Sequence, residues 1–191
     1  MNSKKVYYGK YRNQFKDADI LMFKGVGFVS KIIKWRTKSA YSHAGIVAWW
    51  NDRLMVLEAV GKGVEARPIS YALNHYKGSF DYYRLKEEVP ITAEQRKKMI
   101  VYAQRQLGKG YATGQLIRFF FKLLFNLKMA SKDEGKPPGK FFCSQYVSAV
   151  YNEGGFDLAI EFGDKFTTPN QIAKSKLLEY VGTVKLGEGE G

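Results

Sequence analysis

Short runs of apolar, β-branched and aromatic residues dominate the first half of the chain. Turn signals rich in Gly, Asn and Asp separate these runs. Runs of this length and composition are typical of β-strands. They are ADILMFKG (18–25), HAGIVAWW (43–50), RLMVLEAV (53–60), GVEARPI (63–69) and SFDYYRLK (79–86). We therefore predict one mainly antiparallel sheet, with a short helix over 28–37 between the first two strands.

After Pro90 the pattern becomes helical. Thr92 and Gln95 form a capping box for a helix that ends at Gly108. Three further helices are predicted, over Gln115–Leu127, over Cys143–Asn152, and from the N-cap Thr168 and Pro169 to about Leu178. The pattern also predicts a loop over 130–140, a strand over 181–186 and a flexible tail over 187–191. The predicted fold class is α+β, with an antiparallel sheet packed against helices.

Length and cysteine content limit the class of protein further. A chain of 191 residues with 45% apolar residues is long enough for one globular domain. We place that domain at 19–186, after an N-terminal extension over 1–18. The single cysteine excludes an internal disulfide and a CxxC zinc site, so we expect a reducing compartment. We also expect no metal and no cofactor.

That single cysteine, Cys143, is the first candidate for chemistry. It stands in the first turn of a predicted helix, where unpaired backbone N–H groups and the helix dipole stabilise a thiolate. The alternative is a small buried hydrophobic residue, because free cysteines are often buried. Position alone does not separate these two interpretations.

A thiol nucleophile needs a base, and the chain contains two histidines. His43 opens a predicted apolar strand, so its ring can face a neighbouring helix at the end of the sheet. His75 precedes a turn, where an exposed or capping imidazole is the simpler interpretation. We therefore select His43.

Glu58 is the candidate for the group that orients this histidine. It is the only ionisable residue between Arg53 and Lys62, in a run that is otherwise apolar. A buried carboxylate needs a partner, and a neighbouring antiparallel strand that begins with His43 would supply one. Two alternatives remain: Glu58 faces solvent at a strand edge, or it pairs with Arg53 or Arg67.

The order of short motifs along the chain resembles a known family. SHAGIV, LEAV, LGKGY, FFCSQYVSAVY and FTTPNQIAKS follow one another between about Asp19 and Gly182. This set is similar to the circularly permuted papain-like cysteine hydrolases of the NlpC superfamily, in particular the YiiX/YebB-like branch. The resemblance implies a permuted papain-like fold, in which histidine precedes cysteine. It places the nucleophile on Cys143, the base on His43 and the third polar residue on Glu58.

The resemblance also implies acyl transfer through a covalent acyl-enzyme, as in cysteine peptidases and amidases. We expect the backbone N–H of Cys143 to bind the oxyanion, with Tyr111, Gln145 or Ser144 in auxiliary roles. Gln145 stands where the family often has an acidic residue, and Ala112 follows Tyr111 in place of Asp. Related proteins cut peptide amides of cell walls or, like lecithin retinol acyltransferase, move fatty acyl groups. The expected substrate is therefore a peptide, an acyl-amide or a lipid-like ester.

Positive charge is concentrated in the first half. The chain has 31 Lys and Arg against 18 Asp and Glu, a net charge of +13, and residues 1–86 carry most of the excess. One run contains no acid: Lys24, Lys31, Lys34, Arg36 and Lys38. Such a run is either a solvated face or a site for an anionic membrane or wall polymer. The alternative function is therefore a weakly catalytic or non-catalytic module of the same fold that binds such a surface. We do not expect nucleic acid as a partner, because no recognised nucleic-acid-binding motif is present.

Two further features bear on location. The first residues lack the apolar region of a secretory signal. The stretch Leu116–Leu127 is interrupted by Arg118 and Lys122 and is shorter than the roughly 20 residues that span a bilayer. It is either an interfacial helix or a core helix with two snorkelling cations. We therefore expect a cytoplasmic protein, with peripheral membrane association as an option.

Overall fold

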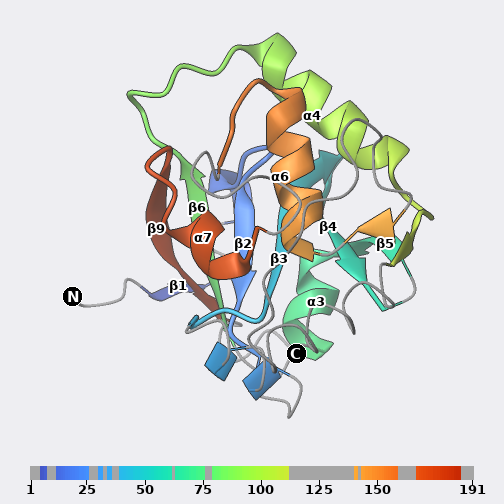
Figure 1. The fold of residues 1–191 in the computed structure, drawn as a ribbon, viewed down its shortest axis with the longest axis vertical. Helices are drawn as coiled ribbons and strands as arrows, with labels where there is room; N and C mark the ends of the chain where they lie inside the picture. The colour runs from blue at the N-terminus through green and yellow to red at the C-terminus, as the bar shows by residue number, and fades with distance from the viewer. Residues whose placement is uncertain are drawn as a thin grey trace, which may run out of the picture.

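The fold is built around one sheet that is covered by helices (Figure 1). The computed structural model describes residues 5–7, 12–25, 30–31, 34–35, 39–61, 63–75, 79–111, 140–141, 143–158 and 167–185. The predicted helix Gln115–Leu127, the loop 130–140 apart from its last residue, and the tail 187–191 lie outside these ranges. Within 28–37, residues 30–31 and 34–35 have helical conformation.

Seven strands form the main sheet, in the order β1-β9-β6-β2-β3-β4-β5. The strands are β1 (Lys5–Tyr7), β2 (Ile20–Phe23), β3 (His43–Trp50), β4 (Arg53–Val60), β5 (Gly63–Pro68), β6 (Phe80–Leu85) and β9 (Leu178–Lys185). Every neighbouring pair is antiparallel except β1 with β9, which is parallel. The five runs predicted as strands in the first half are therefore confirmed. A second, two-stranded sheet pairs β7 (Gly110–Tyr111) with β8 (Lys140–Phe141).

Each face of the main sheet carries its own hydrophobic core. Along β2, Ile20 and Met22 enter one core and Leu21 and Phe23 the other, as the alternation of side chains on a strand requires. Helices α4 (Ala93–Arg105) and α6 (Cys143–Glu153) pack on the first face, and α3 (Ile69–His75) packs on the second. Because both faces are covered, the central strands are buried nearly throughout.

Local signals explain where two of the helices begin and end. Thr92 and Gln95 cap α4 reciprocally, and Gly108 follows the helix with φ of 79°, as predicted. Thr168 caps α7 (Pro169–Ala173) in the same way. The prediction that this helix continues to about Leu178 is wrong. Its C-cap is Lys174, and Leu178 is already buried as the first residue of β9.

The N-terminal residues take part in this architecture. The strand β1 extends the sheet next to β9, and Phe15 and Ala18 are buried in the two cores. A 3-10 helix, η1 (Arg12–Gln14), lies in the sequence between β1 and Phe15. In the part of the chain that the structure describes, no helix is both long and apolar enough to cross a bilayer.

Candidate active site

The fold places three of the predicted residues at the ends of neighbouring elements. His43 is the first residue of β3, Cys143 is the first residue of α6, and Glu58 lies near the end of β4. Helix α6 packs across β3 and β4 (Figure 1). The start of this helix and the start of β3 are thereby brought together, although 99 residues separate the two positions in sequence.

A short hydrogen bond joins His43 to Glu58. The two atoms, Nε2 of the ring and Oε2 of the carboxylate, are 2.6 Å apart. The glutamate is only 4% exposed, so it does not face solvent. Its other oxygen lies 3.7 Å from Nη1 of Arg67, one of the two arginines considered as partners. The ring of Phe23 packs against His43 with centroids 5.1 Å apart, which helps to fix the imidazole.

Cys143 contacts the same imidazole. Its sulfur is hydrogen-bonded with the ring of His43 and accepts backbone N–H bonds from Ala44 and Ser144. Because Nε2 of the ring faces Glu58, Nδ1 is the nitrogen left for the sulfur. The thiol is buried, at 9% exposure, whereas the His43 side chain keeps 13% of its surface in solvent. A small part of the His43 side chain is therefore in contact with solvent.

Electrostatics favour charge on both members of this pair. Burial by itself lowers the pKa of His43 and raises the pKa of Cys143. The mutual attraction and hydrogen bond of the pair outweigh the effect of burial on both pKa values. Glu58 adds to this effect on the pKa of His43, and two backbone N–H groups add to it on the pKa of Cys143. The pKa of His43 is thus raised well above its ordinary value and the pKa of Cys143 is lowered. Both shifts act in the direction of a thiolate next to an imidazolium.

Glu58 is held in its ionised form by its two neighbours. Burial raises the pKa of this carboxyl, but the hydrogen bond and positive charge of His43 and the charge of Arg67 outweigh burial and lower it. A buried carboxylate fixed in this way keeps the imidazole oriented and stabilises its protonated form.

The auxiliary candidates occupy different positions. The hydroxyl of Ser144 donates to the backbone carbonyl of Thr167, so it holds the segment before α7. Gln145 is buried at 8% exposure on α6. The backbone of Tyr111 lies in β7, and its side chain lies outside the described residues, as does the side chain of the competing histidine, His75.

The predicted basic run is only partly described. Lys24 forms an ion pair of 2.8 Å with the buried Asp81. Lys31 is exposed and Lys34 is half-buried. Arg36 and Lys38 lie outside the described residues.

Sequence reasoning missed two features of the main sheet. The first is Gly45, where Val56 and Glu58 approach so closely that a side chain would not fit; a glycine inside a strand pattern is a usable signal for such a close approach. The second is the buried carboxylate of Asp81, which accepts hydrogen bonds from Tyr41 and Thr183 at 2.5 and 2.6 Å. An acidic residue inside the aromatic run 79–86 was the sequence signal that could have predicted this buried carboxylate.

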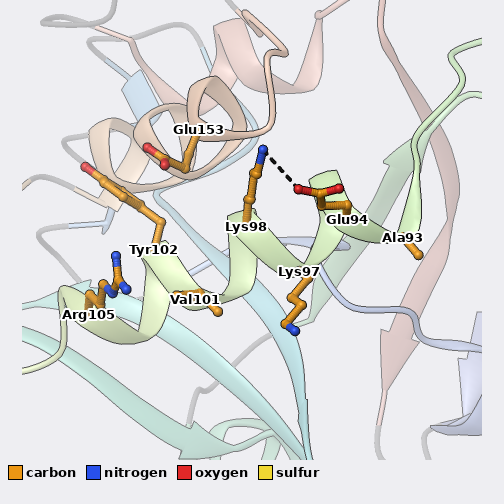
Figure 2. A pocket seen from close by; sticks show the side chains of 8 residues that line it. All are labelled: Ala93, Glu94, Lys97, Lys98, Val101, Tyr102, Arg105 and Glu153. Carbon is orange, nitrogen blue, oxygen red and sulfur yellow. Dashed lines mark ion pairs between the residues drawn. The ribbon is translucent and has the colours of Figure 1, made fainter.

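A separate hollow lies on α4 and the end of α6 (Figure 2). It is lined by Ala93, Glu94, Lys97, Lys98, Val101, Tyr102, Arg105 and Glu153. Lys98 and Glu94 form an ion pair of 3.3 Å across its edge. None of the predicted site residues lines it. Within the described ranges, no group of three or more His, Cys, Asp and Glu side chains is arranged to hold a metal ion.

A papain-like arrangement, with cysteine at a helix start and histidine on an adjoining strand, defines the class of protein. Within that class the chain belongs to the permuted papain-like amidase family YaeF/YiiX (peptidase family C92), whose model matches residues 16–183. The family resemblance predicted from the motifs and the α+β fold class are confirmed.

A solved structure shares this fold. The crystal structure of the metalloprotein YiiX from Escherichia coli O157:H7 is similar with a TM-score of 0.65 and 23% sequence identity. The match covers 88% of this chain and 97% of that one. None of the curated proteins matches this chain in sequence.

Proposed function

We propose that this member of the amidase family is a cysteine hydrolase that acts through Cys143, His43 and Glu58. The observation that carries the proposal is the continuous line of contacts from the buried Glu58 carboxylate, through the His43 ring, to the Cys143 sulfur. A nucleophile, a base within hydrogen-bond reach and a group that orients the base are the components that covalent acyl transfer needs.

The first half of the reaction would form an acyl-enzyme. The Cys143 thiolate attacks the carbonyl carbon of the substrate, and the carbonyl oxygen takes up the negative charge. Backbone N–H groups at the start of α6, including that of Cys143, are suited to bind this oxyanion. As the tetrahedral intermediate collapses, His43 gives its proton to the leaving amine or alcohol, and the carbon–leaving group bond breaks.

The second half would return the enzyme to its starting state. Neutral His43 takes a proton from a water molecule, whose oxygen attacks the carbonyl carbon of the thioester. The carbon–sulfur bond then breaks, releasing a carboxylic acid and the Cys143 thiolate beside imidazolium. Throughout, Glu58 keeps the ring in place and stabilises its positive form, so the ion pair is restored without a further proton donor.

The bond cleaved is either an amide or an ester. Membership in an amidase family supports an amide, such as that of a peptide. A thiolate nucleophile also accepts activated esters, because the same acyl-enzyme forms from both. A panel that contains peptide amides and fatty acyl esters of increasing chain length therefore separates the substrate classes.

The test combines turnover with detection of the acyl-enzyme. Wild type, Cys143→Ala, His43→Ala and the control His75→Ala are assayed against the panel, and intact-mass spectrometry is used to look for one added acyl group per chain. We expect turnover by wild type and His75→Ala, an acyl adduct on wild type, and loss of turnover in both site variants. Turnover by Cys143→Ala at the wild-type rate would exclude the mechanism. An inert Cys143 in a folded wild-type protein would favour the non-catalytic binding module.

A further inference from the structure

Trp35 is the most exposed large hydrophobic side chain among the described residues. It exposes 71% of its surface, against 42% for Trp50 and 46% for Tyr71. Tryptophan is highly buried on average in folded proteins, because the indole is large and mostly apolar. A single exposed apolar residue needs no special explanation, so the surroundings of Trp35 decide what it means.

The sequence on either side of Trp35 is basic. Residues 20–51 contain no Asp or Glu, yet they contain Lys24, Lys31, Lys34, Arg36 and Lys38. Lys24 is paired with Asp81, whereas Lys31 and Lys34 have no ion pair with a carboxylate in the described ranges. Lys31 and Trp35 both have helical conformation and stand four residues apart in the connection between β2 and β3.

We propose that this protein docks on a bilayer that contains anionic phospholipids. The docking surface consists of Lys31, Lys34 and Trp35. The indole suits the interface between headgroups and acyl chains, where its ring is apolar and its N–H remains hydrated. The two ammonium groups are attracted by the negative headgroups. A soluble polyanion would satisfy the lysines but leave the indole in water, so the pairing of the two chemistries favours lipid.

The sheet register places this surface beside the site. The connection that carries Trp35 leaves the sheet at Phe23 and re-enters it at His43, and these two residues are paired across β2 and β3. The docking surface therefore emerges from the end of the sheet at which Cys143 meets His43. Docking would hold that end near the bilayer. Docking does not depend on catalysis, because none of the three site residues takes part in it.

The experiment is sedimentation with vesicles of phosphatidylcholine alone and of phosphatidylcholine with about 30% phosphatidylserine. Trp35→Ala and Lys31→Ala/Lys34→Ala are compared with wild type. Two matched controls are Trp50→Ala, at the other end of β3, and Lys97→Ala/Lys98→Ala, on α4 (Figure 2). Each variant changes solvent-accessible side chains, and circular dichroism checks that it is folded.

We expect wild type and both controls to bind the anionic vesicles and to bind phosphatidylcholine alone much more weakly. Removal of each lysine should weaken binding about fivefold, hence about 25-fold for the double variant, and added salt should weaken wild-type binding. Trp35→Ala should also bind several-fold more weakly. Three results would overturn the proposal: no vesicle binding by wild type, undiminished binding by Trp35→Ala, or equal losses in the controls. Retention of wild type on heparin without vesicle binding would instead indicate a polyanion site.

Discussion

Gly45 faces Glu58 across β3 and β4, and a Cβ added to Gly45 would lie 3.4 Å from the Cβ of Glu58. The same added atom would lie 2.6 Å from Cγ2 of Val56, closer than real contacts allow. His43 and Gly45 share one face of β3, because alternate residues of a strand do. The absence of a side chain at Gly45 thus lets Val56 and Glu58 pack closely against the strand that begins with His43.

Gly45→Ala should therefore disturb both packing and the site. Val56 is buried and β-branched, so it cannot turn away freely. We expect the free energy of unfolding to fall by about 1–3 kcal/mol, as in other overpacked cores, and turnover to fall with it. Urea unfolding and a rate assay measure the two effects. The double variant Gly45→Ala/Val56→Ala should recover part of the turnover, and wild-type stability in Gly45→Ala would contradict the packing argument.

Glu58→Gln should reduce catalysis and change its pH dependence. Loss of the carboxylate removes an attraction that raises the pKa of His43, so the imidazolium should lose its proton at lower pH. We expect kcat/KM to fall by about 10²–10⁴-fold, with its alkaline limb moved to lower pH.

Glu65→Gln is the matched control for this change, because Glu65 also pairs with Arg67, at 2.7 Å, but does not contact His43. Its pH profile should match that of wild type. An equal effect of the two substitutions would show that loss of a charge near Arg67, rather than the contact with His43, matters.

Arg67→Gln should have a smaller effect that appears mainly in acid. The guanidinium helps to lower the pKa of Glu58, so without it the carboxyl should take up a proton at higher pH. The contact is long, at 3.7 Å, and the arginine is 37% exposed, so solvent weakens it. We expect at most about a fivefold loss of kcat/KM at neutral pH, and a larger loss below it. Arg53→Gln, at an exposed position at the start of β4, should leave kcat/KM unchanged both at neutral pH and in acid. An identical loss of kcat/KM in acid in both variants would contradict a specific role for Arg67.

Thr92→Ala tests the helix cap that the sequence predicts. The Thr92 hydroxyl accepts from the backbone N–H of Gln95 at 3.1 Å, and the Gln95 side chain accepts from the Thr92 backbone at 2.9 Å. We expect urea unfolding to show a loss of about 1 kcal/mol. Thr92→Ser keeps the oxygen and should stay near wild type. Equal losses in both variants would point to the methyl group instead of the cap.

Much of the fold could be predicted because the local signals agree with it. The strand that begins at His43 and the hairpin around Asn51 follow from apolar runs and a turn. Helix α7 was predicted too long, since the pattern up to Leu178 also fits a helix and only packing shows that this leucine begins a strand. Tertiary context thus decided the boundary that local propensity could not.

Part of the candidate site could also be predicted from local signals in the sequence. Cys143, His43 and Glu58 could be selected because each residue type stands alone in its segment. Gly45 and the contact of Glu58 with Arg67 depend on strand register and side-chain direction, which one sequence does not give. The backbone N–H groups of Ala44 and Ser144 around the sulfur also carry no side-chain signal, since every residue except proline has one.

The most direct test of the thiolate–imidazolium pair is the rate at which iodoacetamide alkylates Cys143 as a function of pH. Only the thiolate reacts, so the rate reports the fraction of ionised sulfur, and Cys143 is the single cysteine in the chain. The lowered pKa of Cys143 predicts that alkylation persists to lower pH than for an ordinary thiol. In His43→Ala, burial without the imidazolium should move the midpoint to higher pH. A wild-type midpoint at or above the ordinary thiol value, unchanged in His43→Ala, would contradict the ion pair.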